Sequence, residues 1–234
     1  MRFPYARRIV PAAAAITLIT LVASCGTEAG TKTGTEAGAG TGPSSAVSSP
    51  APAVRAPFTE EELTARSLTP QDLPGHRVEE AFQGALVSAD KPECREIATV
   101  LLGGAMTGTL GQVHTRATKD ATTTKVSLHS WAGTKTASGV LAGVRSGGQA
   151  CGGGFNAVSG TDRVKFSNVV ATSAAGGDES LAYRAEQERG GEKSSVEVVL
   201  VRQGTVTATF TANSTSGAAE PPSAVVAAQL GKLR

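Results

Sequence analysis

The sequence has few of the residues from which catalytic and metal sites are built. Three histidines and three cysteines occur in 234 residues, and aromatic residues make up only 4%. No Cys-x-x-Cys or His-x-x-x-His spacing occurs, although redox and zinc sites commonly use such spacings. The sequence also contains no Gly-x-Ser-x-Gly elbow, Walker loop or metalloprotease helix. We therefore expect a non-enzyme that holds neither a metal nor a cofactor.

An excess of charge of one sign is also lacking. The formal net charge is +2, but three of the 22 basic residues, Arg2, Arg7 and Arg8, lie in the first 24 residues. Without them, 19 basic residues face 20 acidic ones, a net charge of −1. A near-neutral chain has no long-range attraction for phosphate backbones. We expect no nucleic-acid partner.

No apolar run is long enough to suggest a permanent membrane span. Residues 9–22 form an apolar stretch of about 14 residues, roughly 21 Å as a helix, whereas the hydrocarbon core is ~30 Å thick. Arginines precede this stretch, and the small residues Ala23 and Ser24 follow it. This order predicts a cleaved export signal over residues 1–24.

The residues at the end of this signal predict a lipid anchor. Val22-Ala23-Ser24-Cys25 resembles the bacterial lipoprotein cleavage site, where the cysteine becomes the new N-terminus and receives lipid. We therefore expect a protein held at the extracytoplasmic face of the cell membrane through lipid on Cys25. An ordinary secreted protein cut nearby is the alternative, and export by the Sec or the twin-arginine route stays open.

The two other cysteines predict a disulfide. Lipid on Cys25 would leave Cys94 and Cys151 as an even pair in an oxidising compartment. A bridge between them would close about 58 residues and stabilise the fold by about 4 kcal/mol in the loop-entropy model. Two buried free thiols are the alternative.

The rest of the chain divides into a tether and one domain. Residues 25–57 are rich in Gly, Thr, Ala, Ser and Pro and show no hydrophobic periodicity. Such a segment cannot bury enough apolar surface to offset the loss of backbone entropy, so we expect a disordered tether. Residues 58–234 are long enough for a single domain with a proper core.

Within this domain, helical patterns alternate with strand patterns. Thr59 and Glu62 form a capping box that predicts a short helix. Asp90 is the predicted N-cap of a second helix that ends at Gly103-Gly104, and a third is predicted over 136–146, ending at Gly147-Gly148. Val226, Leu230 and Leu233 share one face of a last helix after Pro221-Pro222. The predicted strands are 76–82, 112–117, 123–131, 155–158, 164–170, 180–188, 195–202 and 205–212.

These elements predict an α+β fold with a mainly antiparallel sheet, helices packed on one face and one disulfide. Strand alternation predicts two sets of side chains. The set expected in the helix-covered core is Val126, Leu128, Val196, Val198, Leu200, Val206, Ala208 and Phe210. The set expected on the open face is Lys125, His129, Trp131, Arg184, Glu186, Glu188, Val199, Val201, Thr207, Thr209 and Thr211.

The open face supplies the candidate ligand-binding residues. An exposed Trp131 beside His129, Arg184 and Glu186 could recognise a ligand. A solvated sheet face, with Trp131 covering an edge of the core, is the alternative. A cluster of His129, Glu186 and Arg184 in one pocket would instead favour an enzyme of the cell envelope.

Several motifs resemble a known family of secreted domains. Gly177-Asp178-Glu179-Ser180-Leu181-Ala182-Tyr183-Arg184, Leu68-Thr69-Pro70-Gln71-Asp72-Leu73-Pro74-Gly75 and the Cys94/Cys151 pair are similar to the PknH-like extracellular sensor domain of high-GC Gram-positive bacteria. The resemblance implies an α/β sandwich with a cleft for an unidentified ligand. The family typically has two disulfides, whereas this chain can form one.

The residues and the resemblance together predict a function. We expect a lipid-anchored, non-catalytic binding or sensor domain outside the cytoplasm. Its partner would be an unknown small molecule or an exported protein. The alternatives are a cell-envelope enzyme with an unrecognised site, or a structural or assembly partner of another exported protein.

Overall fold

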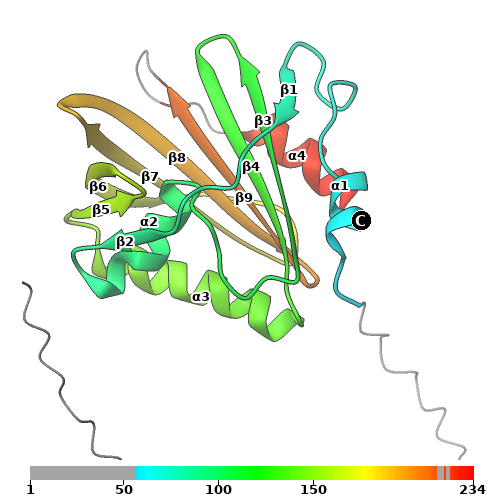
Figure 1. The fold of residues 1–234 in the computed structure, drawn as a ribbon, viewed down its shortest axis with the longest axis horizontal. Coiled ribbons are helices and arrows are strands. Elements are labelled where there is room, and N and C mark those ends of the chain that lie inside the picture. The colour runs from blue at the N-terminus through cyan, green and yellow to red at the C-terminus, as the bar shows by residue number, and fades with distance from the viewer. Residues whose placement is uncertain (1–55, 215–218, 220–221) are drawn as a thin grey trace, which may run out of the picture. The chain divides into compact units, whose positions relative to one another are not determined.

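An antiparallel sheet organises the fold (Figure 1). The computed structural model describes residues 56–214, 219 and 222–234, so the predicted signal, Cys25 and nearly all of the tether lie outside the described residues. The strands are β1 (Arg77–Glu80), β2 (Val87–Ala89), β3 (Gly111–Lys119), β4 (Thr122–Ser130), β5 (Phe155–Ser159), β6 (Asp162–Thr172), β7 (Glu179–Arg189), β8 (Glu192–Gln203) and β9 (Val206–Ser214). The helices are α1 (Glu60–Ala65), the 3-10 turn η1 (Pro92–Cys94), α2 (Arg95–Leu101), α3 (Thr134–Ala150) and α4 (Ser223–Lys232).

The strand order is β1-β3-β4-β9-β8-β7-β6-β5-β2, and neighbours run antiparallel throughout. Strands β5 to β9 form one meander, and β3 and β4 form a hairpin that joins it through pairing of β4 with β9. The predicted α+β fold with an antiparallel sheet is confirmed. The short strand β2, which pairs with β5 at the far edge, was not predicted.

Apolar cores lie on both faces of the sheet. One core packs α2 and α3 against Val196, Val198 and Leu200 of β8. The other packs α1 and α4 against Val199 and Val201 of the same strand. Consecutive strand residues point to opposite faces, so β8 is buried on both sides. The prediction that the helices pack on one face is therefore wrong.

The register also corrects the predicted division of side chains. Val199 of β8 lies opposite Phe210 of β9, which lies opposite Val126 of β4. Directly paired residues point to the same face, so Val126 and Phe210 face α1 and α4, whereas Val198 faces α2 and α3. Each strand's alternation was visible in the sequence, but its match to the neighbouring strand was not.

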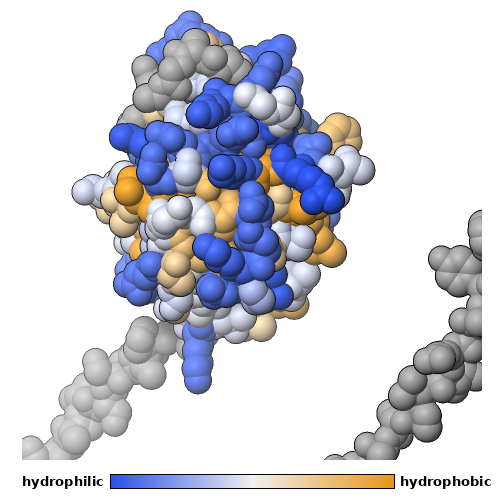
Figure 2. All heavy atoms as spheres, turned by 90° about the vertical axis from the view of Figure 1, so that its left-hand side faces the viewer, coloured by the Kyte–Doolittle hydropathy of each residue, from blue (hydrophilic) through white to orange (hydrophobic). Residues whose placement is uncertain are grey.

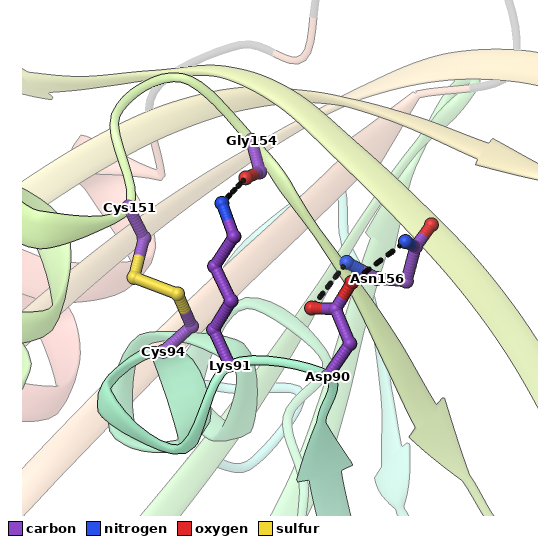
Figure 3. The surroundings of a disulfide bond; sticks show 6 residues. All are labelled: Asp90, Lys91, Cys94, Cys151, Gly154 and Asn156. Carbon is purple, nitrogen blue, oxygen red and sulfur yellow. Dashed lines mark hydrogen bonds between the residues drawn. A yellow bond between two sulfur atoms is a disulfide. The ribbon is translucent and has the colours of Figure 1, made fainter.

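The predicted disulfide is confirmed. Cys94 and Cys151 are buried and bonded, and the bond joins the start of α2 to the residue that caps α3 (Figure 3). Asp90 does not cap a helix, contrary to the prediction. Its carboxylate accepts hydrogen bonds from the backbone N and side-chain Nδ2 of Asn156, at 3.0 and 2.8 Å, and these bonds lower its pKa. The N-cap residue is Lys91, whose Nζ donates to Gly154 O.

The surface at the β6 side of the sheet carries hydrophilic and apolar residues next to each other (Figure 2). Figure 2 views the molecule from the left-hand side of Figure 1 and shows apolar residues between hydrophilic zones. Val170 of β6 is one exposed apolar residue of the domain. It follows a β-bulge between Ser167 and Val170, where Asn168 has a positive φ of 52°.

Local signals in the helices were mostly reliable. The capping box is present, because Glu62 N donates to Thr59 Oγ1 and Thr59 N donates to the Glu62 carboxylate, and Leu230 and Leu233 of the last helix are buried. Helix α3, however, continues through Gly147-Gly148, which were expected to end it. A Cβ on Gly148 would overlap the ring of Tyr183, so this glycine permits close packing of α3 on β7.

Two glycine substitutions in α3 test this packing. Gly148→Ala should lower the free energy of unfolding by about 1–3 kcal/mol, because the new methyl group displaces Tyr183. Gly139→Ala is the matched control, since nothing lies within 4 Å of its Cβ position, and alanine should stabilise the helix by about 0.5–1 kcal/mol. Urea unfolding measures both values, and equal effects would contradict the described contact.

Candidate functional site

Three adjacent strands carry polar side chains on the face that α2 and α3 cover. Residues that pair across β3, β4 and β9 point to this face together. We call these nine residues the polar rows: Gln112, His129 and Thr207; His114, Ser127 and Thr209; Arg116, Lys125 and Thr211. Trp131 continues the face just beyond β4, and its Nε1 donates to Thr207 Oγ1 at 2.9 Å. The predicted grouping of Lys125, His129 and Trp131 with the threonines is confirmed.

Several atoms of the polar rows are buried without partners. His129 is 0% exposed, and among the described residues neither of its ring nitrogens has a hydrogen-bond partner. His114 Nδ1 lies 2.9 Å from Ser127 Oγ, while its Nε2 has no partner in the described chain. The same holds for Gln112 Oε1 and Thr209 Oγ1. An unpaired buried polar atom costs about 1–3 kcal/mol, so this face is not an ordinary core.

Burial keeps the two histidines neutral. Burial and the nearby Lys125 ammonium lower the pKa of His114 to about 4. Burial, with smaller effects of His114 and Lys125, lowers the pKa of His129 to about 3. The rings contact edge to face, with centroids 5.7 Å apart. Neutral imidazoles can both donate and accept hydrogen bonds, so the rows present a mainly uncharged hydrogen-bonding surface between Trp131 and Lys125.

Two segments, residues 81–86 and 102–110, cross this face, and we call them the strap. Both pass in front of β3, β4 and β9 in Figure 1. Gly103 O accepts a hydrogen bond of 2.8 Å from Lys125 Nζ, and Ala105 N donates to Ala85 O at 3.1 Å. The first bond therefore joins the strap to the polar rows at Lys125, and the second joins its two segments to each other.

A pocket of about 450 Å³ opens beside the strap, between α2, α3 and Trp131. Its lining combines six apolar residues with Arg95, Glu96, Thr99 and Thr107, and small-molecule sites likewise join apolar walls to polar groups. Residues that line it include Val87, Arg95, Thr99, Met106, Trp131 and Val140. Trp131 thus lies at a concave pocket rather than on an open surface, and its side chain is buried apart from this contact.

The structure separates the four predicted binding residues. His129 and Trp131 lie together, with ring centroids 6.3 Å apart, on the face of α2 and α3. Arg184 and Glu186 lie on the opposite face, because Arg184 pairs with Glu197 across β7 and β8. Arg184 Nη2 donates to the buried Glu197 carboxylate at 2.8 Å. The predicted exposed cluster is therefore wrong. His129 lies on the other face from Arg184 and Glu186, so these three residues do not form the pocket cluster that would favour an enzyme.

Other cavities are distinct from the Trp131 pocket. One of about 440 Å³ lies between α4, β8 and residues 173–176, with Val199, Ala227 and Leu230 in its lining. Another of about 360 Å³ lies at the edge of β3, with Gln83, Gln112 and His114 in its lining. Across the part of the chain that the structure describes, no three His, Cys, Asp or Glu residues are placed to hold a metal ion. None of the described helices has the length and hydropathy to span a membrane.

Comparison with known proteins identifies the fold. No family model and no curated protein sequence matches the chain. The extracellular domain of PknH from Mycobacterium tuberculosis matches with a TM-score of 0.54 and 14% identity, over 76% of this chain and 97% of that domain. An Rv0999 ortholog from Mycobacterium smegmatis matches with a TM-score of 0.36 and 11% identity, over 67% and 90%. The PknH match confirms the predicted resemblance at the level of the fold.

The buried histidines predict that the domain loses stability in mild acid. Their folded pKa values of about 4 and about 3 lie below the value of about 6.5 in an unfolded chain. As the pH falls, the unfolded chain binds protons first, so the free energy of unfolding is largest above pH ~6.5 and decreases below it. From pH 7 to 5 we expect a loss of up to about 2 kcal/mol per histidine in urea unfolding.

Two variants separate this effect from the titration of carboxylates. His129→Leu should remove about half of the loss between pH 7 and 5. Asp72→Asn should leave that loss unchanged, because hydrogen bonds from Lys232 and Thr69 lower the pKa of Asp72 to about 2. A wild-type free energy of unfolding that stays constant from pH 7 to 5 would contradict the burial of neutral histidines.

Proposed function

We propose that this chain is a lipid-anchored, extracytoplasmic binding domain that takes up a small molecule in the Trp131 pocket without transforming it. The pocket carries the proposal. It joins apolar side chains from α3 and the strap to the ring of Trp131, and Arg95 and Thr99 of α2 add hydrogen-bonding groups. Such a combination favours a ligand with both apolar and polar parts. The fold shared with the extracellular domain of PknH supports the same proposal.

The arrangement of Ser127 and His114 supports a non-catalytic role. Their hydrogen bond of 2.9 Å resembles that of a nucleophile and its base. However, Ser127 is only 2% exposed, and the His114 pKa of about 4 makes the ring a weak base at neutral pH. In the described chain no carboxylate orients the ring, because its Nε2 has no partner. This pair is better suited to structure or ligand contact than to nucleophilic attack.

Two features support a location outside the cytoplasm. The Val22-Ala23-Ser24-Cys25 sequence resembles a lipoprotein cleavage site. The Cys94–Cys151 disulfide is typical of oxidising compartments. Lipid on Cys25 would hold the domain at the membrane, and residues 26–57 would span about 30 Å as a flexible coil. The ligand would then be a molecule of the cell envelope or its surroundings.

The fluorescence of Trp131 tests the pocket directly, because it is the only tryptophan of the chain. We expect the dye 1-anilinonaphthalene-8-sulfonate to quench this fluorescence at saturation. Val140→Phe fills the pocket and should weaken dye binding at least about tenfold. Ala227→Phe adds the same ring to the α4-side cavity and should leave the binding unchanged. Equal binding to wild type and Val140→Phe would refute the pocket as the site.

Membrane fractionation tests the anchor. Cys25→Ser should leave an unprocessed precursor and remove lipid from the mature N-terminus, because serine provides no thiol for acylation. The Cys94→Ser/Cys151→Ser double variant is the control and should remain in the membrane fraction with a lipidated N-terminus. Mass spectrometry of the N-terminal peptide decides between the outcomes. Normal processing and membrane retention of the Cys25→Ser variant would exclude the lipid anchor.

A further inference from the structure

The strap turns apolar side chains toward solvent and its backbone toward polar groups. Phe82, Leu86 and Leu110 are 93%, 67% and 60% exposed. Beneath the strap, the polar rows contain buried atoms that have no partner in the described chain. Folding normally produces the opposite arrangement, with apolar groups inside and polar groups in water or hydrogen bonded. Both departures occur at the same place, and lifting the strap would let the unpaired polar atoms of the rows find hydrogen-bonding partners.

The contacts of the strap permit such movement. Its two segments meet through glycines, since a Cβ on Gly84 would overlap Gly103 O and lie 2.8 Å from Gly104 Cα. Gly103 and Gly108 have positive φ values of 57° and 81°, which place turns within the second segment. The bond from Lys125 Nζ to Gly103 O ties this segment to the sheet. The ends are fixed to β3 and β4, through Ala81 N to His114 O and Leu110 N to Ser130 O.

The uncovered surface has the chemistry of a site for a neutral, hydroxyl-rich molecule. Neutral His114 and His129, Gln112 and the threonines can each donate or accept a hydrogen bond, as the hydroxyl groups of a sugar also can. Trp131 offers a flat apolar face at one end, next to the pocket. The chain from Lys125 to Trp131 is roughly 20 Å long, a length that suits several linked sugar units better than a single sugar.

We propose that the strap opens to expose the polar rows, which bind a neutral oligosaccharide that extends from Trp131 toward Lys125. This proposal rests on the proposed function, because it specifies the ligand class of the Trp131 site. The pocket at Trp131 adjoins one end of the polar rows, and the cavity at Gln112 and His114 lies at the β3 edge of the same rows. The strap covers the middle of the polar rows, where His129 and Thr209 are buried.

Calorimetry with neutral hexasaccharides tests the proposal. Maltohexaose, mannohexaose and chitohexaose are titrated into the wild-type domain, with inorganic phosphate as a charged probe. We expect at least one hexasaccharide, and not phosphate, to bind. Gly84→Ala pushes the strap segments apart and should tighten this binding at least threefold. No binding of any hexasaccharide to either protein, or binding of phosphate alone, overturns the ligand class.

A pair of threonine variants gives a test that does not depend on Gly84→Ala folding well. Thr209→Val removes an unpaired buried hydroxyl, so the melting temperature should rise while hexasaccharide affinity falls at least tenfold. Thr172→Val is the matched control, because its hydroxyl is also unpaired in the described chain but lies in β6, away from the rows. It should raise the melting temperature and leave the affinity unchanged. Equal affinities of Thr209→Val and wild type overturn the proposal.

The dye experiment separates this proposal from the function on which it rests. If no hexasaccharide binds while Val140→Phe still weakens dye binding, the Trp131 pocket binds ligands and only the oligosaccharide class is wrong. If no hexasaccharide binds and Val140→Phe does not change dye binding, the Trp131 site itself is wrong.

Discussion

The antiparallel register between β8, β9 and β4 determines the rest of the structure. Because paired residues point to the same face, the match of Val199 with Phe210 and Val126 assigns every side chain of these strands to one side. Each face of β8 is apolar, so helices cover both faces. On β3, β4 and β9, the same register gathers the apolar residues under α1 and α4 and the polar rows on the other face. A shift of one residue would bury the polar rows in the α4 core.

The same register divides the face covered by α2 and α3 into an apolar part and a polar part. Helices α2 and α3 pack over the apolar side chains of β5 to β8. Beyond β8 the face becomes polar: α2 still reaches β9, where Thr211 Oγ1 donates to Val100 O, and the strap crosses in front of β3, β4 and β9 (Figure 1). The strap is held to the sheet there by backbone hydrogen bonds and by the hydrogen bond from Lys125 to Gly103. The boundary between these two kinds of covering contains Trp131 and its pocket. The fold thus keeps apolar packing over β5 to β8 and places polar side chains on the same face of β3, β4 and β9.

Local features could be predicted from the sequence, and arrangements that depend on distant residues could not. The capping box of Thr59 and Glu62 involves neighbours, and the cysteine pair followed from counting and compartment. In contrast, Gly148 has the sequence pattern of a helix end, whereas its position in α3 depends on the ring of Tyr183, which is distant in the sequence. Asp90 looked like a cap, but its partner is Asn156, 66 residues away.

The candidate site was predicted only in part for the same reason. His129 lies in β4 and Trp131 follows two residues later, directly after the strand, so their common face followed from alternation. Arg184 lies on β7, and its face depends on the register through β8, which short patterns do not specify. The strap was not predicted either, although the apolar residues Phe82 and Leu86 in a segment between strands give a weak signal of it.

Hydrogen exchange followed by mass spectrometry tests the central claim that the strap is a separately opening cover on a rigid, register-fixed sheet. The account predicts that amides of residues 81–86 and 102–110 exchange at least about a hundredfold faster than those in the centres of β4, β8 and β9. Exchange of the strap only at the slow rate of these central strands would show that it opens with global unfolding, and would contradict the account.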